Sequence, residues 1–193
     1  MTNEEKEKLT RVFNLFLGWN LGDIRKAAHL LPNTFESISR EKITKIYPEY
    51  DGGAMIGSLI LIMTAIHSVA QFSLEHDGDK QFKWFIDTYL KKVNNGYDGE
   101  EIYALRCSLI KNYGLIARVY KQQKIVGFAV TDFGPDHLQI TKNGKVLNIK
   151  QFMIELQFAI QNFFSDIILE KIDKKYLEKI IYYHDHELIG SVK

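Results

Sequence analysis

Residues 97–114 read YDGEEIYALRCSLIKNYG and form the segment around which the chain is arranged. Asp98 can accept a hydrogen bond from the backbone of a first helical turn, and Glu101, three positions later, completes the pattern of a capping box. Gly114 suits the left-handed position that follows a helix. The segment therefore predicts one amphipathic helix with a defined start and a defined end.

One charge is misplaced on this helix. At about 100° per residue, the apolar side chains share a single arc of the helical wheel. The arc comprises Ile102, Leu105, Leu109, Ile110 and Tyr113. Arg106 falls inside the arc, whereas Lys111 lies about 140° away from Arg106, on the far side.

A guanidinium on a core-facing stripe must have a partner, because burying an unpaired charge is costly. The partner can be a carboxylate, a set of carbonyls, a bound phosphate or another subunit. Two structural alternatives stand beside a functional site. Arg106 can form a salt bridge to Asp87 or Asp166, or its stem can lie along the core while its head reaches water.

The composition favours one ordinary globular domain spanning 1–193. Of the 193 residues, 46% are hydrophobic, which suffices for a sizeable core. The chain has 25 basic and 24 acidic residues and a formal charge of +1, so there is no DNA signal and no global bias toward nucleic acid or anionic membranes. Cys107 is the single cysteine, which excludes an intramolecular disulfide and suits a reducing cytosol.

The sequence supports neither a signal peptide nor a membrane-spanning helix. The N-terminus lacks the basic-then-apolar order of a signal peptide, so we expect a cytoplasmic protein. The run Ala54–Phe72 is uncharged and about as long as a spanning helix, but it contains several polar residues and lacks flanking basic ones. We interpret it as a buried central helix and expect no membrane partner.

The N-terminal third begins with a clear helix. Thr2 and Glu5 form a capping box, so the first helix starts at about Asn3. Its apolar period continues to Leu31, before Pro32, and the stretch from there to Gly53 is irregular. After the central helix, apolar residues from Phe82 to Val93 recur at helical spacing and predict another amphipathic helix.

The pattern changes after Gly114. Leu115–Tyr120 is ambiguous, Lys124–Asp132 reads as a strand, and Asn143-Gly144 between two apolar runs predicts a β-hairpin. Asn148 can then cap a long helix, and Asp173 a shorter final one. The predicted fold class is mainly α: a helical bundle with a small antiparallel β-hairpin or meander, at about 124–149, inserted before the C-terminal helices.

The segment Leu105–Tyr113, preceded by Gly57–Leu61 and Phe82–Ile86, resembles a bacterial branch of the HEPN superfamily of helical-bundle proteins. The similarity covers Ala54–Asn112. In active members, an arginine followed after four to six residues by a histidine forms a metal-independent ribonuclease site, usually across a dimer. Arg106 matches the arginine.

No histidine follows at that spacing, because the three positions hold Lys111, Asn112 and Tyr113. A lysine is normally locked in its charged form and does not trade protons near neutral pH. Lys111 can instead stabilise phosphate charge, as can the bidentate guanidinium of Arg106. We therefore name Arg106, Asn112 and Tyr113 as ligand-binding candidates, and Arg106, Lys111 and Asn112 as weak catalytic candidates.

The resemblance implies a catalytically degenerate binding or regulatory protein, homodimeric through the Arg106 helix, from a defence or toxin–antitoxin context. Its partner would be RNA, a nucleotide or another protein, and no cofactor or metal is expected. The alternative is a divergent metal-independent ribonuclease that uses Arg106 with Lys111, Asn112 or Tyr113.

Other polar side chains are weaker candidates. His184-Asp185-His186-Glu187 invites a metal interpretation, but its histidines are two residues apart and no distant ligands can be named, so a solvated tail is expected. His67 is interpreted as a satisfied core histidine, of interest if it faces Arg106. Cys107 is interpreted as packing.

Overall fold

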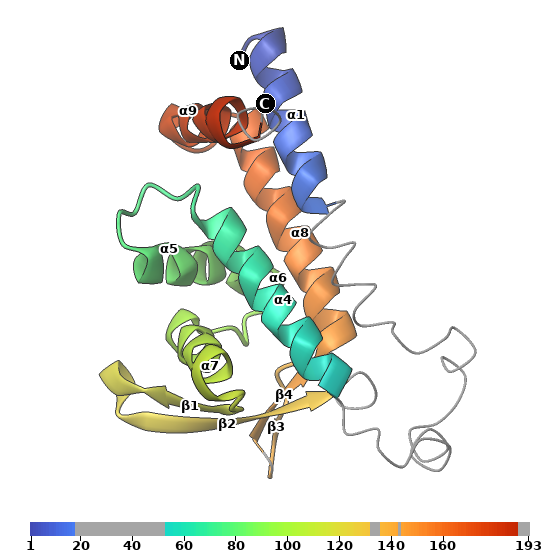
Figure 1. Cartoon of the computed structure of the whole chain (residues 1–193), viewed down its shortest axis with the longest axis vertical. Coiled ribbons are helices and arrows are strands. Elements are labelled where there is room, and N and C mark those ends of the chain that lie inside the picture. The colour runs from blue at the N-terminus through green and yellow to red at the C-terminus, as the bar shows by residue number, and fades with distance from the viewer. Residues whose placement is uncertain (18–52, 132–135, 143, 189–193) are drawn as a thin grey trace, which may run out of the picture.

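The computed structural model describes residues 1–17, 53–131, 136–142 and 144–188 (Figure 1). The longer helices are α1 (Asn3–Leu15), α4 (Gly53–Ala70), α7 (Gly99–Asn112), α8 (Ile149–Ile168) and α9 (Lys174–Tyr183). Shorter helical segments are α5 (Gly78–Phe85), η3 (Ile86–Leu90), α6 (Lys91–Val93), η4 (Tyr120–Gln122) and η5 (His184–Leu188). A small sheet lies between α7 and α8 in chain order, which confirms the predicted fold class.

Helix α8 is the long axis of the bundle (Figure 1). Helix α1 lies along one half of it, where the rings of Phe13 and Phe164 are 5.0 Å apart, and α4 packs against the other half. Helices α5 and α7 pack on α4 and on each other, and the sheet lies beyond α7. This arrangement places α7 between the helical core and the sheet.

The predicted helix starts are confirmed by their caps. The Thr2 capping box is present, and the side chains of Asp98, Asn148 and Asp173 each accept a backbone hydrogen bond from the first turn of α7, α8 and α9. The continuation of the first helix to Leu31 and the irregular stretch that follows it lie outside the described residues.

Both ends of α7 differ from the prediction in detail. The Glu101 carboxylate does not reach back to the cap; it accepts hydrogen bonds from Lys124 Nζ at 2.6 Å and Lys145 Nζ at 2.7 Å. At the other end, Tyr113 rather than Gly114 takes the left-handed conformation, with φ of 51°. The helix is therefore joined to the sheet through Glu101.

The sheet contains β1 (Ile116–Val119), β2 (Lys124–Thr131), β3 (Ile140–Thr141) and β4 (Gly144–Asn148), in the order β1-β2-β4-β3. The antiparallel β3–β4 pair confirms the hairpin predicted at Asn143-Gly144. The ambiguous Leu115–Tyr120 stretch contributes β1, so the sheet begins earlier than predicted. The β2–β4 pair is parallel, and the sequence carries no local signal for it.

A close backbone approach accompanies this parallel pair. Gly144 has φ of 112°, in the region that favours glycine, and a Cβ placed there would clash with the backbone of Gly127. Only a residue without a side chain fits at this position. Gly144 therefore also lets β4 lie against β2.

Aromatic rings fill the core between α8 and the helices around it. Phe163 lies 5.3 Å from Tyr89 and 5.9 Å from Trp84, both edge to face, and Trp84 stacks on Tyr176 at 5.6 Å. Among the helices that the structure describes, none is both long and apolar enough to cross a membrane. Residues of the predicted central helix, such as Ile62, are instead buried in this core.

We expect Phe163→Ala to lower the free energy of unfolding by about 3–5 kcal/mol, because it removes a fully buried ring and leaves a cavity. Phe158→Ala is the matched control on the same helix, since that ring is 53% exposed, and it should cost less than about 1 kcal/mol. Urea denaturation of both variants measures the difference. Equal costs would contradict this account of the core.

A buried polar cluster lies where the sheet meets α8. His137 Nδ1 accepts a hydrogen bond from the Asn148 backbone N–H at 3.1 Å, so Nε2 carries the proton and donates to the Tyr97 hydroxyl at 2.8 Å. The buried Glu155 carboxylate lies 3.6 Å from Nε2. Burial lowers the pKa of His137 to about 4, against the opposing effect of Glu155.

This cluster predicts acid sensitivity. The folded chain keeps His137 neutral down to about pH 4, whereas an unfolded chain protonates it near 6.5. Between these values the unfolded state binds the extra proton, so stability is full above pH 6.5 and falls by up to about 3 kcal/mol as the pH approaches 4.

Urea denaturation at several pH values should show a smaller fall for His137→Gln than for the wild type, even though the variant is less stable at neutral pH. His76→Gln, which changes an exposed histidine, is the control and should keep the wild-type pH dependence. If His137→Gln also keeps the wild-type pH dependence, the buried cluster is not the cause of the acid sensitivity.

Candidate functional site

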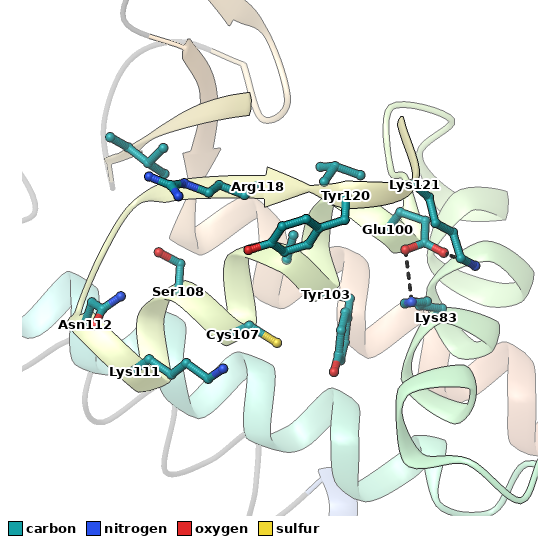
Figure 2. A pocket seen from close by; sticks show the side chains of 13 residues that line it. Lys83, Glu100, Tyr103, Cys107, Ser108, Lys111, Asn112, Arg118, Tyr120 and Lys121 are labelled. Atoms are coloured by element: carbon teal, nitrogen blue, oxygen red, sulfur yellow. Dashed lines mark ion pairs between the residues drawn. The ribbon is translucent and has the colours of Figure 1, made fainter. Parts of the chain in front are cut away.

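A cavity of about 620 Å³ lies between α7 and the β1–η4 segment, with Lys83 of α5 beside it (Figure 2). Helix α7 lines it with positions 100, 104, 107, 108 and 111, which share one helical face because each lies three or four residues from another member of the set. The strand side is formed by residues on both faces of β1. The cavity is thus a product of α7 packing on the sheet.

Positive charge dominates the lining. Among the described residues that line the cavity, four side chains are cationic, those of Lys83, Lys111, Arg118 and Lys121, and one is a carboxylate, that of Glu100. Lys83 Nζ lies 2.9 Å and Lys121 Nζ 2.8 Å from this carboxylate. The carboxylate is therefore already paired within the protein.

These ion pairs keep Glu100 charged. Burial alone would raise its pKa, but hydrogen bonds from Lys121 and Lys83 lower it below the ordinary value. The hydrogen bond to Glu100 in turn raises the pKa of Lys121. Lys111 and Arg118 form no ion pair within the described part of the chain.

The lining also has an aromatic and a neutral polar component. The ring of Tyr103 lies beneath Lys83 Nζ at 4.6 Å, and burial, with hydrogen bonds to Asp79 and Cys107, raises the pKa of its hydroxyl. In Figure 2, Glu100 and its two lysines gather at one end of the cavity. Ser108, Asn112 and Arg118 lie at the other end, with Tyr120 between the two ends.

Only some of the residues named from the sequence line the cavity. Lys111 and Asn112 line the cavity, but Arg106 does not. Arg106 is half-buried with its guanidinium 5.4 Å from the ring centre of Phe82, and no carboxylate of the described residues forms an ion pair with it. Tyr113 is 75% exposed and also lies outside the lining.

The two salt-bridge partners considered for Arg106 are engaged elsewhere. Asp87 accepts a hydrogen bond from the Gly99 backbone at 3.0 Å, and Asp166 lies 3.8 Å from Lys171 Nζ. Arg106 instead lies partly on the core and partly in water, which is the second alternative weighed above. The aromatic face of Phe82 supplies part of its environment.

The apolar arc predicted from the helical wheel is only partly buried. Ile102, Leu105 and Leu109 are buried, but Ile110 is 58% exposed, so Arg106 lies at the margin of the buried stripe rather than inside it. The wheel gives the angle of each side chain. It does not show how far neighbouring elements extend around the helix.

His67 of α4 interacts with Arg106. Burial and then the charge of Arg106 lower the pKa of His67. Its Nδ1 atom is buried and has no hydrogen-bond partner among the described residues.

The C-terminal histidines do not form a solvated tail. His184 is buried, with Nδ1 2.9 Å from Asp185, and the ring of His186 stacks on Tyr182 at 4.1 Å. In the part of the chain that the structure describes, no group of three or more His, Cys, Asp or Glu side chains is placed to hold a metal ion.

The sequence did not identify Lys83, Glu100, Arg118 or Lys121 as site residues. Glu100 was accessible to sequence reasoning, because it lies on the same helical face as Lys111. The others come from α5, β1 and η4, and nothing local in their segments indicates that they meet. A scan against family models, a search of curated proteins and a search of solved structures found no match to the chain, so the HEPN resemblance stays a prediction.

Cys107 lines the cavity, and this predicts its reactivity. A small thiol reagent such as iodoacetamide should modify the native protein once, and a reagent much larger than the cavity should react more slowly. Mass spectrometry measures both rates, with Cys107→Ser as the unlabelled control, since the chain has one cysteine. Modification only after unfolding would contradict an accessible cavity.

Proposed function

We propose that this chain is a non-catalytic binding protein that captures an anionic ligand in the cavity between α7 and β1. The observation that carries the proposal is that the described lining gathers four cationic side chains and one carboxylate, which is already paired. Lys111 and Arg118 are the residues that would contact the ligand first, because no partner within the described residues neutralises them.

The size and chemistry of the cavity support binding. Its volume of about 620 Å³ lies within the range of small-molecule and peptide-sized sites. Arg118 can form paired hydrogen bonds to a carboxylate or phosphate, and Ser108 and Asn112 can add neutral ones. Tyr103 and Tyr120 offer aromatic surface for the apolar part of the ligand.

A binding role also agrees with the sequence resemblance in which the motif histidine is replaced. RNA, a nucleotide and an acidic protein segment are all anionic and remain the classes of partner. Among the described lining residues there is no histidine to trade protons near neutral pH, and Arg106 lies outside the lining. The homodimer and the defence context implied by the resemblance remain predictions.

The proposal is tested by titrating the protein with three fluorescent probes: an ATP analogue, a single-stranded oligoadenylate RNA and poly-L-glutamate. At least one should bind, with an affinity that falls as salt is added. Lys111→Ala and Arg118→Ala should each weaken it by about tenfold, since each removes a charged hydrogen-bond donor. Lys175→Ala and Arg11→Ala, at exposed positions on α9 and α1, are the matched controls and should have no effect.

The bound probe should also slow the alkylation of Cys107. If no probe protects Cys107, or if the Lys111→Ala and Arg118→Ala proteins bind as well as the controls, the cavity is not the ligand site. Cleavage of the RNA without metal, abolished by Arg106→Ala, would instead show a ribonuclease.

A further inference from the structure

Strand β1 has an open edge in the part of the chain that the structure describes. It is the terminal strand in the order β1-β2-β4-β3 of the described sheet, and β2 pairs with one side of it only. Leu115 C=O accepts from the Phe128 backbone N–H at 2.8 Å, and these two residues extend the register by one step beyond the Ile116–Gly127 pair. Because antiparallel pairs alternate, the backbone groups of Ile116 and Arg118 then point away from β2, toward the open edge.

The cavity borders this edge. It is lined by Arg118 and Val119, which are adjacent in β1 and whose side chains leave opposite faces of the strand. A cavity that is lined by residues of both faces is expected at the edge of the strand, where both faces can be reached. The cavity is therefore a groove with the open edge of β1 on one side and the helix α7 on the other.

The two walls of the groove match in length. Four residues of β1 extend over about 13 Å, and the α7 face from Glu100 to Lys111 rises over about 16 Å. Both lengths suit about four residues of extended polypeptide. A peptide placed there would hydrogen-bond to the edge of the strand and lie against the helix.

We propose that the ligand is an acidic segment of a partner protein that binds in extended conformation as an additional strand along β1. This inference rests on the proposed function and names the class of its ligand. The backbone of the segment pairs with Ile116 and Arg118, and its carboxylates meet the cations of the groove. The exposed apolar surface of the same strand receives its other side chains.

The charge of the groove and its exposed apolar side chains both favour an acidic peptide segment as the ligand. Lys111 and Arg118 attract carboxylates. Arg118 and Ile116 share the exposed face of β1, so a segment paired with this edge would place an acidic residue beside Arg118 and an apolar residue two positions away beside Ile116. Ile116 of β1 is 61% exposed, and Tyr120, the first residue of η4, is 83% exposed, which suits contact with apolar side chains. The phosphates of a nucleotide or RNA could pair with the cations. Unlike a peptide backbone, however, they would not form strand pairing with the edge N–H and C=O groups of β1.

The first experiment selects octapeptides from a random library on the intact protein. The expected result is enrichment of peptides that contain aspartate or glutamate, which bind the Lys111→Ala and Arg118→Ala proteins about tenfold more weakly and slow the alkylation of Cys107. Enrichment of neutral or basic peptides, or of none, overturns the inference.

The second experiment tests pairing with the edge. Ile116→Pro removes the outward N–H of β1 without changing the charge and is tolerated at an edge position. It should weaken the selected peptide about three- to tenfold more than Ile116→Ala does, the effect of one hydrogen bond. N-methylation of the peptide at alternate residues tests the same contact without altering the protein. Equal binding of methylated and unmethylated peptides overturns strand addition.

The two proposals fail in different ways. If the ATP analogue or the RNA binds at Lys111 and Arg118 and protects Cys107 while acidic peptides do not, the anion site stands and the inference about the partner falls. If neither class of probe depends on Lys111 and Arg118, the proposed function itself fails.

Discussion

The position of α7 depends on the Glu101 carboxylate, which holds the helix to two strands at once. It accepts hydrogen bonds from Lys124 of β2 and Lys145 of β4, and Lys145 also donates to the Gly96 carbonyl just before the helix. Burial would raise the pKa of Glu101, but the two lysines lower it, so the carboxylate remains charged. Removing it would leave two ammonium groups unpaired at a partly buried junction.

The groove follows from this junction. Once the start of α7 is tied to β2 and β4, the helix lies beside β1, and the face with Glu100 and Lys111 meets the strand. Lys83 of α5 reaches the same space because α5 packs on α7. Positive charge from separate segments therefore accumulates in one place without a global excess in the chain.

The local parts of the fold could be predicted because they depend on hydrogen bonds between near neighbours. Thr2, Asp98 and Asn148 cap helices through backbone N–H groups three residues away, and the turn at Gly144 needs a residue without Cβ. Glu101 shows the limit of such reasoning. Its pattern with Asp98 was that of a capping box, yet two lysines at distant positions compete successfully for the side chain.

By itself the sequence determined the helix starts, the apolar central helix, the β3–β4 hairpin and the mainly α class, since periodicity and caps act within a few residues. It also determined that Arg106 and Lys111 diverge on the wheel. Only the tertiary structure decided the parallel β2–β4 pairing, the exposure of Ile110 and the meeting of Lys83, Arg118 and Lys121 around one groove. Packing and charge act through space, and these residues are neighbours there but not along the chain.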